Sequence, residues 1–194
     1  MYQFLPAPNY AKKAESWVCI DSAFTEDQIK EIIRIGEALH SQPAVIGENE
    51  INENIRKCKI SWIGINEDTK FIYDILGDLV IKVNELHFGF NLFGFVERFQ
   101  FTTYEADNNH YDWHMDRGLD VTSPRKLSVV LMLSDPEDYE NGFLEFMPSA
   151  NVVQTEKKLG RIFIFPSWML HRVTAVTKGT RKSLVAWVAG PNFV

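Results

Sequence analysis

Three residues in the second half of the chain have the types and spacing of a metal site. His114 and Asp116 are separated by one residue, and residues two apart on a β-strand point to the same face. His171, 57 residues further on, is the candidate for a second imidazole. Two histidines and one carboxylate on one face of an octahedron leave three positions free, as iron(II) oxygenases require. The residues therefore predict an Fe(II) site with room for a bidentate cosubstrate and O₂.

Each part of this pattern is weak when it stands alone. The motif His-x-Asp occurs by chance in many proteins, and a lone buried histidine such as His171 is usually a core residue. The other histidines, His40, His87 and His110, have no partner at a suitable spacing. We interpret those three as surface or structural residues.

An arginine near His171 strengthens the interpretation. Arg181 stands ten residues after His171, and Ser183 follows two residues later. We expect His171 to begin one strand and Arg181 to begin the next, so that antiparallel pairing brings Arg181 into the metal-site cavity. A guanidinium binds a carboxylate through two parallel bonds, and 2-oxoglutarate has a carboxylate at the end remote from the metal. The sequence predicts that Arg181 and Ser183 bind that end, with an exposed strand-edge arginine as the alternative.

Residues 1–95 show helical periodicity. Thr25 followed by Gln28 is a capping-box pattern, and apolar residues from Ile29 onward follow helical spacing. A second helix is expected from about residue 69 to residue 86, and residues 56–63 are expected to form a strand. The expected buried stripe of the second helix contains Phe71, Ile72, Ile75, Leu76, Leu79 and Val83.

Residues 96–194 change to a strand period. Residues 97–104 alternate, and residues 127–133 are continuously apolar, as in a strand buried on both faces. Asn141-Gly142 is a turn signal. Six or more short strands favour a sandwich or jelly roll, with the helices packed outside one sheet. The remaining strands are expected at residues 143–147, 161–165, 172–176 and 183–188.

Composition sets limits on the class of protein. The 194 residues suit one domain, and the net charge of −6 argues against a broad nucleic-acid footprint. Cys19 and Cys58 lack a CxxC motif, which favours two buried free thiols in a reducing cytoplasm over a disulfide. Residues 1–13 lack the apolar stretch of a signal peptide, and no segment has the length of a membrane helix. We therefore expect a soluble, cytoplasmic protein.

The arrangement of these residues resembles the Fe(II)/2-oxoglutarate oxygenases of the prolyl 4-hydroxylase type, and most closely the bacterial PKHD-type branch. The strongest similarity lies in residues 165–181, which read FPSWMLHRVTAVTKGTR. Residues 138–142 are similar to the family's Tyr-Glu-Gly-Gly turn, with Asn141 in place of the first glycine. Trp187 matches a family tryptophan, and Arg56 and Trp62 loosely match its N-terminal region. The resemblance covers about residues 20–190 and is strong from Tyr104 onward.

The resemblance implies a fold and a cofactor set. The fold is mainly β with flanking helices, a double-stranded β-helix or cupin-like jelly roll, in one domain over residues 1–194. Residues 1–95 would support the metal-binding core of residues 96–194. The implied cofactors are Fe(II), 2-oxoglutarate and O₂, with Tyr104 contacting 2-oxoglutarate. Met132 stands where several relatives have a tyrosine that helps to hold the remote carboxylate, and a thioether cannot donate that bond.

The implied reaction is hydroxylation of an unactivated C–H bond, with a peptidyl proline as the leading substrate. A hydroxylase of a free amino acid or other small molecule would share every residue named above. A nucleic-acid demethylase would share the triad, but such enzymes usually carry a second arginine soon after the first, and residues 182–191 contain none. A non-enzymatic, cupin-like binding module would keep the β-barrel but would not bind a metal. Tyr111 and Trp113 flank the His-x-Asp motif, and at least one of them is expected at the cavity mouth.

Overall fold

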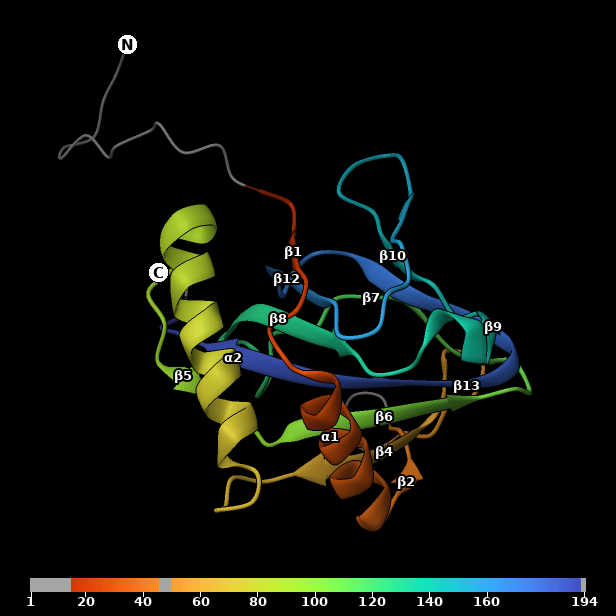
Figure 1. The fold of residues 1–194 in the computed structure, drawn as a ribbon. Helices are drawn as coiled ribbons and strands as arrows, with labels where there is room; N and C mark the ends of the chain where they lie inside the picture. The colour runs from red at the N-terminus through yellow and green to blue at the C-terminus, as the bar shows by residue number, and fades with distance from the viewer. Residues whose placement is uncertain (1–14, 46–49, 193–194) are drawn as a thin grey trace, which may run out of the picture.

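Two antiparallel sheets share one long strand (Figure 1). The computed structural model describes residues 15–45 and 50–192, so the interpretation of residues 1–13 lies outside the described residues. The major sheet has the strand order β1-β12-β8-β13-β6-β4-β2, and the smaller sheet joins β3, β7, β9, β10 and β11 to β13. The strands are β1 Val18–Ile20, β2 Gln42–Pro43, β3 Arg56–Lys57, β4 Lys59–Ile63, β5 Gly94–Phe95, β6 Phe99–Glu105, β7 Asn109–His114, β8 Arg125–Met132, β9 Tyr139–Asn141, β10 Leu144–Phe146, β11 Val153–Gln154, β12 Ile162–Pro166 and β13 His171–Ala189.

Strand β13 corrects one expectation. The segments expected as two separate strands, residues 172–176 and 183–188, belong to one continuous strand. Its first half pairs with β7, β9 and β10 in the smaller sheet, and its second half pairs with β6 and β8 in the major sheet. Gly179 lies at the change of sheet with a φ of 71°, and an added Cβ there would collide with the Asp138 carbonyl. The antiparallel pairing expected between the His171 and Arg181 segments is therefore wrong.

The strand expected over residues 56–63 is also divided. β3 pairs with β7 in the smaller sheet, whereas β4 pairs with β6 in the major sheet. Cys58 lies between the two short strands and is buried, while Cys19 is exposed. Both thiols are free, as expected, but the prediction that both are buried is wrong for Cys19. The change of sheet places Arg56 beside the same strand that carries His114.

The two helices begin where the sequence predicts. Helix α1 spans Glu26–Ala38, and the capping box is present: Thr25 Oγ1 accepts from the Gln28 amide at 3.2 Å, and Gln28 Oε1 accepts from the Thr25 amide at 2.9 Å. Helix α2 spans Lys70–Val83 and continues into a π-helical turn, η1, over Asn84–Phe88. A short 3-10 helix, η2, covers Pro136–Asp138.

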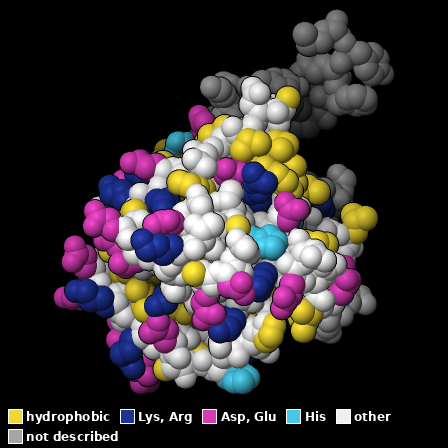
Figure 2. Space-filling view, turned by 90° about the vertical axis from the view of Figure 1, so that its right-hand side faces the viewer, with side chains coloured by type: hydrophobic (Ala, Val, Ile, Leu, Met, Phe, Trp, Pro, Cys, Tyr) yellow, Lys and Arg dark blue, Asp and Glu magenta, His cyan; other side chains and the backbone are white. Residues whose placement is uncertain are grey.

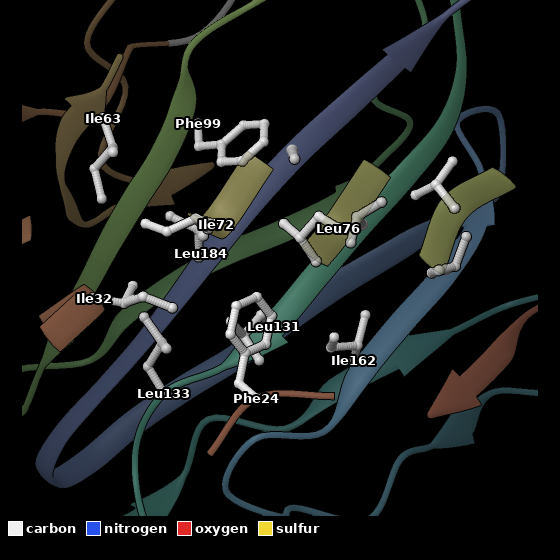
Figure 3. Packing of buried hydrophobic residues seen from close by; sticks show 14 of the residues in the cluster. Phe24, Ile32, Ile63, Ile72, Leu76, Phe99, Leu131, Leu133, Ile162 and Leu184 are labelled. Carbon is white, nitrogen blue, oxygen red and sulfur yellow. The ribbon is translucent and has the colours of Figure 1, made fainter. Parts of the chain in front are cut away.

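The main core lies between the two helices and the major sheet (Figures 1 and 3). Ile72 and Leu76 of α2 point onto the sheet beside Leu131 of β8 and Leu184 of β13. Alternate residues of these strands point to the other face, so strands such as β8 are buried on both sides, as expected from the apolar run. That second face forms one wall of the candidate site. None of the helices formed by the described residues is long and apolar enough to cross a membrane.

Candidate active site

The three candidate metal ligands meet between the two sheets. His114 ends β7, His171 begins β13, and the two residues are direct partners across the smaller sheet. Asp116 lies two residues beyond the end of β7, so the turn carries it rather than the strand. The ligand atoms of the three residues lie within 4.8 Å of one another. His114 Nε2 is 3.6 Å from Asp116 Oδ1, and His171 Nε2 is 3.7 Å from Asp116 Oδ2.

Backbone carbonyl groups fix the orientation of both imidazoles. His114 Nδ1 lies 2.7 Å from the Asp112 carbonyl oxygen, and His171 Nδ1 lies 2.9 Å from the Met169 carbonyl oxygen. A carbonyl oxygen can only accept, so each Nδ1 carries a proton, and in the neutral imidazole the lone pair is therefore on Nε2. Burial and the neighbouring His114 together lower the pKa of His171 to about 4, against the opposing effects of Asp116 and the Met169 carbonyl. A neutral imidazole is the form that binds a metal.

A hydroxyl group orients the carboxylate. Ser128 Oγ donates to Asp116 Oδ2 at 2.6 Å and contacts Ser167 Oγ at 3.0 Å. Burial on its own raises the pKa of Asp116, but the two histidines and Ser128 together hold it well below its usual range. The carboxylate is therefore ionised and held between the two imidazoles. Two imidazoles held by backbone carbonyls and one fixed carboxylate suit Fe(II), which accepts nitrogen and oxygen ligands in a facial arrangement.

Arg181 is the other charged residue predicted for the site. Its side chain is 1% exposed, and no carboxylate among the described residues forms an ion pair with it. Nη1 donates to Ser183 Oγ at 3.2 Å, Nη2 lies 3.5 Å from Met132 Sδ, and Nε has no partner. A buried charge without a counterion is costly unless an anion binds to it. A guanidinium without a carboxylate partner is therefore suited to bind the remote carboxylate of 2-oxoglutarate.

The remaining predicted residues surround Arg181. Tyr104 is buried on β6, directly opposite Arg181 in the register, and the Arg181 guanidinium lies 5.1 Å from its ring centroid. Ser183 occupies the same face of β13 as Arg181, as residues two apart on a strand must. Met132 lies against the guanidinium, so the thioether occupies the place expected from the sequence.

One cavity of about 750 Å³ joins the triad and Arg181. Tyr111 lies on its wall and stacks on the His114 imidazole at 3.4 Å between centroids. Trp113 points elsewhere, against the Arg172 guanidinium, so of these two aromatics Tyr111 alone lines the cavity. Trp62 and Trp187 line a further part of the wall, 6.3 Å apart between centroids.

Two supporting residues were missed from the sequence. Ser128 is the one hydroxyl in residues 127–133, so the run is not continuously apolar as the interpretation had it, and that isolated serine was the available signal. Arg125 donates to the Asp116 carbonyl oxygen at 2.9 Å, forms an ion pair with Glu97 and stacks over Trp187 at 3.8 Å. No local pattern marks Arg125, because Glu97 and Trp187 are distant in sequence. Both residues hold the loop that carries Asp116.

Comparison with known proteins agrees with this geometry. Residues 99–189 match the profile of the 2OG-Fe(II) oxygenase superfamily. A PKHD-type hydroxylase from a strain of Prochlorococcus marinus is 31% identical over 140 residues, covering 72% of this chain and 60% of the relative. Another, from a strain of Synechococcus, is 36% identical over 100 residues, covering 52% of this chain and 45% of the relative. The chain thus spans less than two thirds of the length of these relatives.

Solved structures share the fold. A Pseudomonas putida prolyl-4-hydroxylase superposes with a TM-score of 0.74 at 22% identity, covering 91% of this chain and 94% of that one. A Trichoplax adhaerens prolyl hydroxylase, solved with a hypoxia inducible factor peptide fragment, gives 0.77 at 18% identity, covering 90% and 83%. The fold is therefore the predicted jelly roll with flanking helices, and the superfamily implies Fe(II), 2-oxoglutarate and O₂ as cofactors. Residues 99–189 match the 2OG-Fe(II) oxygenase superfamily, and the chain is similar to PKHD-type hydroxylases over part of their length.

Proposed function

We propose that this protein is an Fe(II)- and 2-oxoglutarate-dependent dioxygenase that hydroxylates an unactivated C–H bond of a prolyl residue in a peptide or protein. One observation carries the proposal. The triad and the buried, carboxylate-free Arg181 open into the same cavity. A metal ligand set and a separate anion site in one enclosed space are what a cosubstrate with two carboxylates requires.

The chain's residues have distinct roles in this proposal. His114, Asp116 and His171 would hold the iron, and Arg181 with Ser183 and Tyr104 would hold 2-oxoglutarate. When bound, Fe(II) with 2-oxoglutarate and O₂ supplies the oxidising power to convert C–H to C–OH, releasing succinate and CO₂. The protein supplies position and the exclusion of water. The Asp112 and Met169 carbonyl groups keep both imidazoles aimed at the metal.

The cavity walls support a proline-sized substrate. Tyr111, Trp62 and Trp187 line the cavity that holds the triad. Aromatic side chains suit a saturated ring through apolar contact. The two prolyl hydroxylases named above share the fold, which supports the substrate class by analogy alone. We also propose that residues 1–194 act as one domain, because β3 and β4 contribute Arg56 and Trp62 to the cavity.

A free amino acid or another small molecule is the second candidate substrate. The cavity volume of about 750 Å³ lies within the range typical of small-molecule sites, so it favours neither candidate. A nucleic-acid substrate is less well supported, since basic and acidic side chains are interspersed on the face shown in Figure 2. A binding module without metal has no need of two imidazoles with their Nε2 atoms turned toward a fixed carboxylate.

A turnover screen tests the proposal. Enzyme, Fe(II), 2-oxoglutarate and O₂ are incubated with proline-containing peptides, free amino acids and methylated oligonucleotides. Succinate release and a mass gain of one oxygen are measured for each. We expect both signals with at least one peptide, at a proline. Stimulation by oligonucleotides alone contradicts the proposal, and stimulation by free amino acids alone favours the second candidate.

A further inference from the structure

A second buried guanidinium lines the cavity. Arg56 lies on β3 in the smaller sheet, opposite Tyr111 of β7, whereas Arg181 enters from the half of β13 in the major sheet. Its side chain is 8% exposed. Nη1 donates to the Val45 carbonyl oxygen at 3.3 Å, and Nε is buried without a partner. The guanidinium lies 4.4 Å from the Tyr111 ring centroid, and the Cys58 thiol is also a neighbour.

Among the described residues, no carboxylate forms an ion pair with Arg56. Cys58, Tyr104 and Tyr111 surround it, and burial raises the pKa of each, so all three are neutral near pH 7. The acidic residue on the cavity wall outside the triad, Asp120, is exposed and accepts bonds from Thr122. Arg125, the other arginine of the cavity, is already paired with Glu97. Among the residues that the structure describes, Arg56 is therefore a buried cation without a counterion.

In the proposed complex, the cofactors and the triad do not supply a counterion for the positive charge of Arg56. Fe(II) and Arg181 bring three positive charges, and Asp116 with the two carboxylates of 2-oxoglutarate brings three negative ones. The charge of Arg56 is additional, and burying it without a counterion is costly. A group that arrives with the substrate would neutralise it.

Arg56 is also close to the metal ligands. Its guanidinium carbon is 4.4 Å from the Tyr111 ring centroid, and that ring is 3.4 Å from the His114 imidazole. The two separations together limit the distance between the guanidinium and the imidazole to under about 8 Å. Arg56 and the triad therefore lie within the reach of one amino-acid-sized ligand in the same cavity.

We propose that Arg56 binds a carboxylate of the substrate and so selects acidic substrates: a free amino acid through its α-carboxylate, or a peptide through an acidic side chain next to the hydroxylated residue. A carboxylate suits the site because the planar guanidinium can bind it through two parallel bonds. The inference rests on the proposed function, since it concerns the substrate of the same cavity.

Binding measurements on Mn(II)-loaded protein with 2-oxoglutarate, in the absence of O₂, test the proposal without turnover. The probes are L-proline against L-prolinamide, and proline-containing peptides with Asp or Glu against the same peptides with Asn or Gln. Tryptophan fluorescence reports the affinity. We expect at least one carboxylate probe to bind about tenfold or more tightly than its amide. A preference for L-proline would identify the α-carboxylate of a free amino acid as the ligand of Arg56. A preference for the Asp or Glu peptides would identify an acidic side chain.

Two variants test whether Arg56 is the residue that causes the preference for carboxylate probes. Arg56→Lys should reduce the preference for the carboxylate by about tenfold while the affinities for metal and 2-oxoglutarate stay unchanged. Arg172→Lys is the matched control, because Arg172 also stacks on an aromatic ring, Trp113, but outside the cavity. It should keep the preference. Equal binding of carboxylate and amide probes, or no saturable binding by any carboxylate probe, overturns the inference.

The same experiment separates this inference from the proposed function. Metal and 2-oxoglutarate affinities are measured first in each sample. Failure of the wild-type protein to bind both contradicts the proposed function. Normal binding of both, without any preference for carboxylate probes, contradicts the role of Arg56 alone. Loss of metal or 2-oxoglutarate in Arg56→Lys would assign Arg56 to the cofactor site and also overturn the inference.

Discussion

Single residues determine the electrostatics of the cavity. Asp116 is the one buried carboxylate at the triad, and it is held by Ser128 and by the loop that Arg125 anchors. Arg181 carries a buried charge whose described contacts are a hydroxyl, a thioether and an aromatic ring. None of these groups neutralises a guanidinium. The cavity is therefore arranged to receive one cation at the triad and an anion at Arg181.

Replacing Arg181 by lysine keeps the charge and removes the planar fork. Losing one charge-assisted bond of about 1.5–3 kcal/mol should raise the apparent dissociation constant of 2-oxoglutarate by roughly tenfold or more. Titration of the Fe(II)-loaded protein with 2-oxoglutarate measures this. Arg172→Lys, on the same strand but outside the cavity, should leave it unchanged. An unaltered dissociation constant in Arg181→Lys would exclude the assigned role.

Replacing Ser128 by alanine removes the hydroxyl that orients Asp116. Partners of metal ligands typically contribute about 10–100-fold to metal affinity, and we expect a loss of that size for Fe(II). Ser61→Ala is the control, since Ser61 Oγ also donates a buried bond, at 2.9 Å to the Gly36 carbonyl, but away from the triad. Competition with a metal chelator gives both affinities. Equal losses in the two variants would indicate a general effect on stability.

Two strands bring the site together. β7 ends at His114, the first half of β13 begins at His171, and the second half of β13 carries Arg181 and Ser183. The change of sheet at Gly179 lets one strand supply both His171 of the triad and Arg181. Helices α1 and α2 cover the opposite face of the major sheet and keep it fixed from behind (Figure 1).

Gly179→Ala should destabilise the fold where β13 changes sheet. The residue has a positive φ, and an added Cβ meets the Asp138 backbone. Gly89→Ala is the matched control, because Gly89 has a φ of 68° with nothing within 4 Å of an added Cβ. The control should lose about 1 kcal/mol for backbone strain, and Gly179→Ala clearly more. Urea unfolding measures both, and equal losses would mean that the contact with Asp138 is unimportant.

Gly36→Ala tests how closely α1 packs on the sheet. An added Cβ would overlap the Phe101 ring, so we expect an overpacking cost of about 1–3 kcal/mol against a helix-propensity gain of about 1 kcal/mol. Gly77→Ala on α2 is the control, since its Cβ meets its nearest atom, in Phe95, at 3.9 Å. That variant should be stabilised. Thermal unfolding that shows stabilisation by both substitutions would contradict close packing at Gly36.

In the molecule as a whole, features that depend on residues close in sequence could be predicted, whereas features that depend on contacts between distant residues could not. The capping box at Thr25, the two helices and the grouping of His114 with Asp116 depend on residues close in sequence, and the sequence predicted them. Alternation along β13 shows the faces of the strand but not which sheet each half joins. The alternation alone therefore predicts two separate strands in place of β13. Arg56 lies on a two-residue strand whose partner is distant in sequence, so its place in the cavity had only a loose resemblance to indicate it.

An anaerobic titration of the protein with Fe(II) and 2-oxoglutarate, followed by the weak visible charge-transfer band, tests the proposed metal and cosubstrate sites most directly. We expect one Fe(II) per chain and a band that saturates with 2-oxoglutarate. His171→Ala should lose most of the iron and the band, while His110→Ala, whose ring contacts the Asn54 and Asn108 carbonyls outside the triad, should keep both. Stoichiometric iron and a full band in His171→Ala, or no band in the wild-type protein, would contradict the proposed sites.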